Sequence, residues 1–175
     1  MPEIAGATPR VARAGYKDWD RCDLTYVVLD EGTTVAGVTT QNLCCSAEVE
    51  LCRAHLPHGR ARALVVNAGN SNAFTGQRGK DAVDAITAQV AAQLHCEEAE
   101  IFVSSTGVIG VPLPGDKAQA GLCAAFDAAP CSWEDVTHAI GTTDTFAKGA
   151  TASAIVDGRK VQIVGIIKGS GMIAP

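Results

Sequence analysis

Short apolar runs in the first part of the chain predict β-strands. Residues 24–29 (LTYVVL), 63–66 (ALVV) and 101–103 (IFV) combine hydrophobic side chains with β-branched or aromatic ones, as buried strands do. Residues 33–40 (TTVAGVTT) follow a turn signal at Glu31-Gly32 and are predicted to form the strand that neighbours 24–29. These runs together predict a sheet.

Apolar positions three and four residues apart predict helices between and after these strands. The segments are 46–55, which Pro57 stops, 80–94 and 117–126. Ser132, with Asp135 three residues later, is typical of a capped N-terminus, so a further helix is predicted from there to Gly141.

The rest of the pattern predicts a loop and a hairpin. Residues 67–76 are polar and rich in glycine and asparagine, which favours a loop. Near the end, an Asp157-Gly158 turn separates a strand from a second strand at 160–167. The 175 residues fit a single domain, residues 1–175, and the mixture of elements predicts an α/β fold with layered sheets covered by helices.

Charge and hydropathy exclude several classes of partner. The formal net charge is −5 and no basic run is present, which argues against a nucleic-acid surface. No apolar run is long enough to span a bilayer and no basic amphipathic helix appears, so no membrane contact is expected. The start of the chain, MPEI, does not resemble a secretion signal, and we expect a cytoplasmic protein.

The cysteines and histidines do not form a metal-binding pattern. The seven cysteines are odd in number and include no Cys-x-x-Cys pair, so we expect reduced thiols that fill the core. His55 and His58 straddle Pro57 without a Cys or carboxylate set beside them. No metal and no cofactor are therefore expected.

Residues 104–110 (SSTGVIG) contain a candidate for acyl chemistry. Thr106-Gly107 directly follows a predicted strand, and a glycine there lets backbone come close to a ligand and point an amide at it. Acyl transfer needs such donors where negative charge develops on a carbonyl oxygen. An ordinary turn between a strand and a loop explains the same residues.

Three further polar features have both a binding and a structural interpretation. The asparagines of residues 67–73 (NAGNSNA) could hold irregular backbone near a site, or form Asx-turns. The segment 142–145 (TTDT), which includes Thr145, could bind a polar substrate or cap the preceding helix. Lys168 ends an apolar strand, where it could reach a substrate carboxylate or extend to water.

The chain contains no convincing nucleophile of its own. It has no Gly-x-Ser-x-Gly elbow, and neither Ser104 nor Ser105 has an assignable base. Its last residues, 168–175 (KGSGMIAP), carry no charge after Lys168 and are less polar than an ordinary C-terminus. We interpret this end as that of one chain of a processed pair.

Four segments together resemble the ornithine acetyltransferase family, also called the bifunctional glutamate N-acetyltransferase family. The segments are 66–76 (VNAGNSNAFTG), 105–110 (STGVIG), 142–145 (TTDT) and 168–175 (KGSGMIAP). They occur in the order found in that family, and the resemblance extends from about Gly6 to the end of the chain.

The resemblance implies a two-chain enzyme of arginine biosynthesis. Family members cut themselves before a threonine, which would lie just beyond residue 175, and that threonine is the nucleophile of the second chain. This chain would then be the alpha chain of an α2β2 heterotetramer. The implied fold is a layered sandwich that resembles N-terminal-nucleophile hydrolases with a distinct connectivity.

The resemblance also implies a reaction and site residues. The acetyl group passes from N2-acetylornithine to the threonine and then to glutamate, by a ping-pong mechanism, and some members also accept acetyl-CoA as donor. Thr106 and Gly107 match the family's oxyanion hole, and Thr145 and Lys168 match its substrate-binding positions on this chain.

Two other functions fit the sequence. A related self-cleaving aminopeptidase has the same architecture but transfers the acyl group to water. A non-catalytic subunit that binds small molecules would also lack a nucleophile. Acetyl transfer to glutamate distinguishes the first alternative, and a copurifying chain that begins with threonine distinguishes the second.

Overall fold

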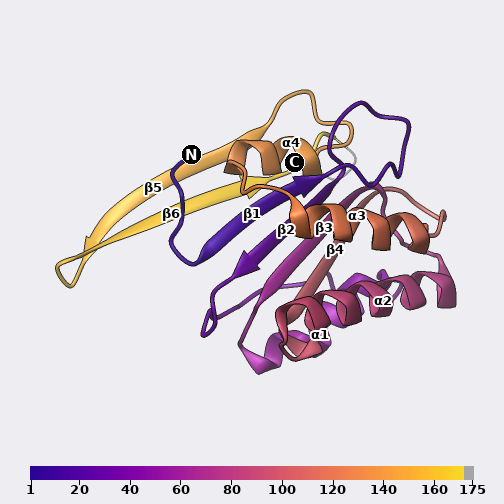
Figure 1. The fold of residues 1–175 in the computed structure, drawn as a ribbon, viewed down its shortest axis with the longest axis horizontal. Helices are drawn as coiled ribbons and strands as arrows, with labels where there is room; N and C mark the ends of the chain where they lie inside the picture. The colour runs from indigo at the N-terminus through magenta and orange to yellow at the C-terminus, as the bar shows by residue number, and fades with distance from the viewer. Residues whose placement is uncertain (172–175) are drawn as a thin grey trace.

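The computed structural model describes residues 1–171 and contains a four-stranded sheet, helices packed against it, and a separate β-hairpin (Figure 1). The strand order is β1-β2-β3-β4, with β1 and β3 antiparallel to β2 and β4 parallel to β3. The strands are β1 (Ala7–Ala12), β2 (Leu24–Leu29), β3 (Ala63–Asn70) and β4 (Ile101–Val108).

The parallel pair is joined by the long helix α2 (Gly76–Leu94), because parallel strands need a crossover connection. A short 3-10 turn, η2 (Glu98–Glu100), leads from this connection into β4. Both strands therefore end at the same edge of the sheet, with Gly69 opposite Gly107.

The main core lies between one face of the sheet and helices α2 and α3 (Gly115–Asp127). Leu24 and Tyr26 of β2 contribute to it, together with Ile86 of α2 and Leu122 of α3, each at most 2% exposed. Burial of apolar side chains of this size is the main interaction that holds the helices against the sheet.

Two more helices complete the packing. Helix α1 (Ala47–His55) lies against β4 and ends in the 3-10 turn η1 (Leu56–His58), which contains Pro57, as predicted. Helix α4 (Trp133–Ile140) contacts β1, β2 and β3. None of the helices within residues 1–171 combines the length and apolar character of a bilayer span.

The predicted capping pair and the predicted hairpin are confirmed. Ser132 Oγ accepts a hydrogen bond from Asp135 N at 3.1 Å, and the Asp135 carboxylate accepts one from Ser132 N at 2.9 Å. Strands β5 (Lys148–Val156) and β6 (Arg159–Ile167) pair across a turn in which Asp157 and Gly158 both have positive φ. Figure 1 shows this hairpin reaching away from the four-stranded sheet.

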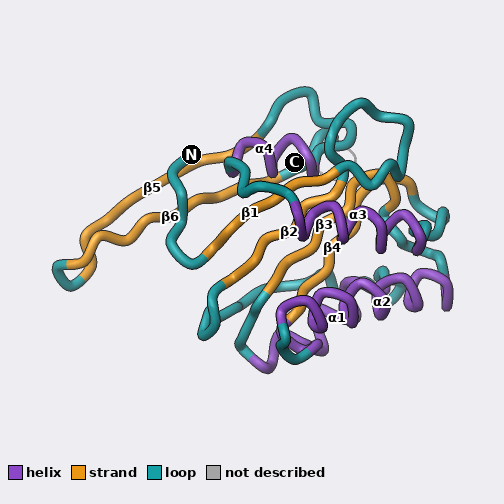
Figure 2. Tube along the Cα trace, in the orientation of Figure 1, coloured by secondary structure: helices purple, strands orange, loops and turns teal. Residues whose placement is uncertain are grey.

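One predicted strand is wrong. Residues 33–40 form a loop, with an isolated bridge between Thr34 and Arg60, and Val38 is 100% exposed (Figure 2). The reason is topological, since β1 and β3 already occupy both edges of β2. A β-branched run has no partner there, whatever its local propensity.

Two other expectations need correction. Strand β1 was not predicted, and β3 continues through Asn70 into the segment that its composition had favoured as a loop. The cysteines are free, as expected, but none is fully buried, so they do not fill the core. Five of them lie in connecting segments, at the rim of the packed layers: Cys22, Cys44, Cys45, Cys96 and Cys131.

Packing of α3 generates a test of the fold. A Cβ atom at Gly121 would lie 2.5 Å from Ala14 Cβ and 3.1 Å from Ala14 Cα. We predict that Gly121→Ala lowers the free energy of unfolding by about 1–3 kcal/mol, because backbone must shift to admit the methyl group. Chemical denaturation of the complete protein measures this.

The matched control is Gly115→Ala in the same helix, where nothing lies within 4 Å of the added atom. This substitution should leave stability unchanged or raise it by up to about 1 kcal/mol. Equal effects of the two substitutions would contradict the packing described for α3.

Candidate functional site

Contrary to the prediction, Thr106 and Gly107 do not follow the strand but lie within it, because β4 continues through Val108. They sit where β3 and β4 end side by side. Gly107 has φ +130°, and a Cβ atom there would lie 2.5 Å from Gly69 O and 2.8 Å from Asn70 N. Residue 107 must therefore be glycine, because the neighbouring strand passes too close for any side chain. The close approach fixes the path of the backbone on which Thr106 is carried.

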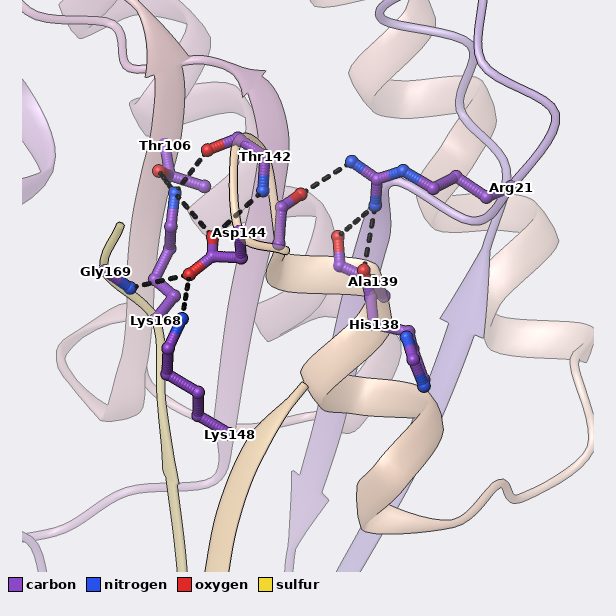
Figure 3. A network of polar contacts seen from close by, with 10 residues as sticks. Arg21, Thr106, His138, Ala139, Thr142, Asp144, Lys148, Lys168 and Gly169 are labelled. Atoms are coloured by element: carbon purple, nitrogen blue, oxygen red, sulfur yellow. Dashed lines mark hydrogen bonds and ion pairs between the residues drawn. The ribbon is translucent and has the colours of Figure 1, made fainter. Parts of the chain in front are cut away.

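Lys168, at the end of the hairpin, reaches this end of β4. Its Nζ donates hydrogen bonds to Thr106 Oγ1 at 2.5 Å and to Thr142 Oγ1 at 2.7 Å, and lies 4.0 Å from Asp144 Oδ2 (Figure 3). Three of the segments singled out in the sequence thus meet at one point, although they are far apart in the chain.

Asp144 is the anionic centre of this cluster. Its side chain is 8% exposed and accepts hydrogen bonds from Lys148 Nζ at 2.8 Å, Gly169 N at 2.8 Å and Thr142 N at 3.3 Å. The hydrogen bonds from Lys148, Gly169 and Thr142 hold the pKa of Asp144 well below its usual range. Burial lowers the pKa of Lys168, while the charge of Asp144 opposes that effect.

Arg21 anchors the segment that carries Thr142 and Asp144. Its guanidinium group donates to His138 O at 2.8 Å and to Gly141 O at 2.6 Å, which are carbonyls at the C-terminal end of α4 (Figure 3). Cations are favourable at that end of a helix. Arg21 thereby fixes the point where the chain leaves α4 for the cluster.

Thr145 lies apart from these hydrogen bonds. It is exposed and lines a pocket of about 190 Å³ together with Arg21, Thr142 and Asp144. The structure therefore puts Thr145 at a cavity beside the cluster, and Thr106, Gly107 and Lys168 at the cluster itself.

The asparagines of residues 67–73 hold irregular backbone, the first of the two interpretations above. Asn67, Asn70 and Asn72 are each at most 2% exposed. Asn67 Nδ2 donates to Asn70 O at 2.9 Å, and Asn72 Nδ2 donates to Gly79 O at 3.0 Å. These bonds fix the chain as it leaves β3 for α2.

Ser105 does have a carboxyl neighbour, contrary to the sequence-based expectation. Its Oγ contacts Glu48 Oε1 and lies 2.5 Å from Asn67 Oδ1. Glu48 is 2% exposed, so this pair lies inside the protein and not at its surface. No cluster of three or more metal-binding side chains occurs in residues 1–171.

The arrangement suits the stabilisation of negative charge. Because Thr106 Oγ1 accepts a hydrogen bond from an ammonium group, its own proton is available for a second oxygen atom. The ammonium groups of Lys148 and Lys168 also outnumber the Asp144 carboxylate, which lies within 4.0 Å of both, so the cluster favours anionic ligands.

Some of these residues could not be found from the sequence. Asp144 and Thr142 belong to the segment noted for its hydroxyls, but its composition did not indicate that Asp144 would be the anionic centre of the cluster. Arg21 and Glu48 stand alone in the sequence, and their roles depend on contacts with residues more than twenty positions away.

Comparisons with known proteins identify the family of this chain. Residues 9–175 match the family model described as ArgJ family. The chain is 58% identical over 175 residues to the arginine biosynthesis bifunctional protein ArgJ of Zymomonas mobilis, and 50% identical over 177 residues to the protein of that name in Bradyrhizobium diazoefficiens. Each match includes the whole of this chain but only 43% of the length of the relative.

Two crystal structures have the same fold. The arginine biosynthesis bifunctional protein argJ from Bacillus halodurans gives a TM-score of 0.89 at 34% identity, with 98% of this chain and 90% of that chain covered. Ornithine acetyltransferase complexed with ornithine, from Mycobacterium tuberculosis, gives 0.84 at 31%, with 98% and 92% covered. The predicted layered α/β fold of this class is confirmed. Residues 172–175, the last part of the segment 168–175, lie outside the described residues.

The depressed pKa of Asp144 predicts a dependence of stability on pH. Since that pKa is lower in the folded protein, the ionised carboxylate stabilises the fold fully above its unfolded-state pKa of about 4. This stabilisation is lost as the pH falls through the folded-state value. Asp144→Asn should therefore show a smaller drop in melting temperature between pH 7 and pH 3 than the wild type.

Asp84→Asn is the matched control, because Asp84 is 56% exposed and lies 3.8 Å from Lys80 on the surface of α2. It should keep the pH dependence of the wild type. A wild-type acid response in Asp144→Asn would show that this carboxylate does not stabilise the fold.

Proposed function

The chain belongs to the ArgJ family, and from that premise we propose that it is the alpha chain of an acetyltransferase that moves the acetyl group of N2-acetylornithine to glutamate. The observation that carries this proposal is the hydrogen bond from Lys168 to Thr106. It joins two of the four segments that resemble the ornithine acetyltransferase family. It gives a hydroxyl donor and a cation at one point of the structure.

Thr106 and Gly107 are the proposed oxyanion hole. In the first half of the reaction, a threonine hydroxyl adds to the acetyl carbonyl carbon, and the α-amine of that threonine takes the proton. The carbonyl oxygen then carries a negative charge, which the Thr106 hydroxyl and the Gly107 amide would stabilise. Ornithine leaves with the proton. In the second half, the glutamate amine attacks the acetyl carbon, the ester bond to the threonine oxygen breaks, and that oxygen regains a proton from the attacking amine as N-acetylglutamate leaves.

Lys168 and Thr145 are the proposed substrate contacts of this chain. Both substrates carry a carboxylate, and the cluster around Lys168 has an excess of positive charge. Thr145 lines the neighbouring pocket together with Arg21, Thr142 and Asp144. The ornithine bound to the Mycobacterium tuberculosis relative supports an amino-acid ligand.

A partner chain would supply the nucleophile. The chain spans 43% of the length of the curated relatives it matches, so a longer precursor is proposed, cut just beyond residue 175. The hairpin supports a partner, because its large apolar side chains are exposed. They are Ile155, Val156, Val161, Ile163 and Ile167, which are 42–69% exposed. We further propose an α2β2 assembly, a cytoplasmic location and acetyl-CoA as a second donor.

Expression of the complete reading frame tests this function. The purified protein should transfer acetyl groups from N2-acetylornithine to glutamate, and mass spectrometry should find a second chain that begins with threonine. Release of amino acids from peptides without acetyl transfer would support the aminopeptidase instead. A single stable chain with neither activity would contradict both enzymes.

Thr106→Ala removes the proposed hydroxyl donor. We expect the turnover number to fall about a hundred- to thousand-fold, the usual effect of losing one oxyanion donor, and cleavage of the precursor to slow. Steady-state kinetics and gel analysis of processing measure the two effects. Ser104→Ala is the matched control, since Ser104 is an exposed hydroxyl on the same strand. Wild-type turnover and processing in Thr106→Ala would refute the assignment.

Lys168→Ala tests the proposed substrate contact. We expect the KM for acetylornithine to rise about tenfold or more, because a charged hydrogen-bonding partner of the carboxylate is lost. Lys160→Ala, at an exposed lysine of β6, the strand that Lys168 follows, should leave KM unchanged. An unchanged KM in Lys168→Ala would remove this residue from the substrate site.

A further inference from the structure

A glutamate is buried next to the strand end that carries Thr106. Glu48, in the first turn of α1, is 2% exposed. Its Oε1 accepts hydrogen bonds from Asn72 Nδ2 at 2.9 Å and from Ser105 Oγ, while Oε2 is buried without a partner. Within residues 1–171, no cationic side chain lies at ion-pairing distance from it.

This carboxyl group is hard to explain as a source of stability. Burying a carboxyl group with one oxygen unpaired is unfavourable, and apolar replacements of buried polar groups are often neutral or stabilising. Such a group calls for another explanation. Its two hydrogen-bond partners provide one.

The first partner is Ser105, the residue before Thr106 in β4. Successive side chains of a strand point to opposite faces of the sheet. Ser105 bonds to Glu48 and to Asn67 Oδ1 on the face of α1, whereas Thr106 bonds to Lys168 from the hairpin. The end of β4 is thus held from both faces.

The second partner is Asn72, in the loop that follows β3. This loop lies against the residues after Gly107, since Ser71 N donates to Val108 O at 2.9 Å and Gly110 N donates to Ala73 O at 2.9 Å. Asn72 has a positive φ of 54°, a conformation that needs support from its surroundings. Glu48 therefore connects β4, through Ser105, with the loop after β3, through Asn72.

We propose that Glu48 is a positioning residue for acetyl transfer, which holds Thr106 and Gly107 at the end of β4 in the geometry that meets the oxyanion. This inference rests on the proposed function. Glu48 acts through Ser105 and Asn72 and does not touch substrate. Its loss should therefore lower the turnover number and leave substrate affinity unchanged, because a misplaced donor weakens binding of the transition state only.

The test uses the complete protein with Glu48→Met, which fills the same volume without a carboxyl group. The turnover number should fall about tenfold, because the contribution of one hydrogen bond to holding the oxyanion donors is lost. The KM for acetylornithine should stay within about twofold, and the melting temperature should be unchanged or higher. A side chain with a purely structural role would give the opposite, a lower melting temperature with normal turnover of the folded fraction.

Two other variants control for the chemistry of the side chain. Glu48→Gln keeps an oxygen that accepts both hydrogen bonds and should retain most of the turnover. Glu50→Met, on the exposed surface of the same helix, should behave as the wild type in all three measurements.

Ser105→Ala tests whether Glu48 acts through Ser105. It also replaces Glu48→Met as the test if that variant does not fold. It should lower the turnover number by a similar factor, and the double variant should lose no more than the larger single effect, because both residues act through one contact. Wild-type turnover in Glu48→Met or Ser105→Ala, or additive losses, would overturn this inference alone. A wild-type protein without acetyl transfer would overturn the proposed function and the inference with it.

Discussion

The close pairing of β3 and β4 at Gly69 and Gly107 is the constraint on which the rest of the site depends. At residue 107 a Cβ atom would lie 2.5 Å from Gly69 O, so the two backbones fit together only because a side chain is absent. The parallel arrangement requires that both strands end at the same edge. As a result, the polar segments that follow the two strands meet there, and the position of Thr106 is set by backbone contact and not by a flexible loop.

The hairpin brings the charged half of the site to this edge. Lys168 follows β6, and it reaches Thr106 only because the Asp157-Gly158 turn reverses the chain and returns it beside β5. Asp144, with an 8% exposed side chain, is stable as an anion there because three donors satisfy it. The carboxylate in turn holds the backbone at Gly169 and so aligns the lysine.

Local sequence signals predicted most helices and strands correctly. The wrong predictions arise where contacts with distant residues decide the structure. Asp157-Gly158 and the Ser132 cap depend on neighbours in sequence, so they could be read without the fold. Residues 33–40 have strand propensity, but both edges of their predicted neighbour β2 are occupied by β1 and β3, which only the topology determines.

The site shows the same division. Thr106, Gly107 and Lys168 were found because their segments resemble a known family. Glu48 could not be found from its sequence neighbours, since a glutamate in the first turn of a helix is ordinarily a surface residue favoured by the helix dipole. Only its contacts with Ser105 and Asn72 identify it as buried.

The proposed oxyanion donors are fixed by contacts with other residues of this chain. Hydrogen bonds among residues 1–171 join Thr106 to Lys168 and hold Asp144 against Lys148 and Gly169. Electrostatic catalysis depends on donors that are fixed before charge develops. The exposed apolar side chains of the hairpin lie on the two strands that lead away from this cluster. Under the proposed function, a partner that covers them would approach the cluster along the hairpin and would deliver its nucleophile from that side.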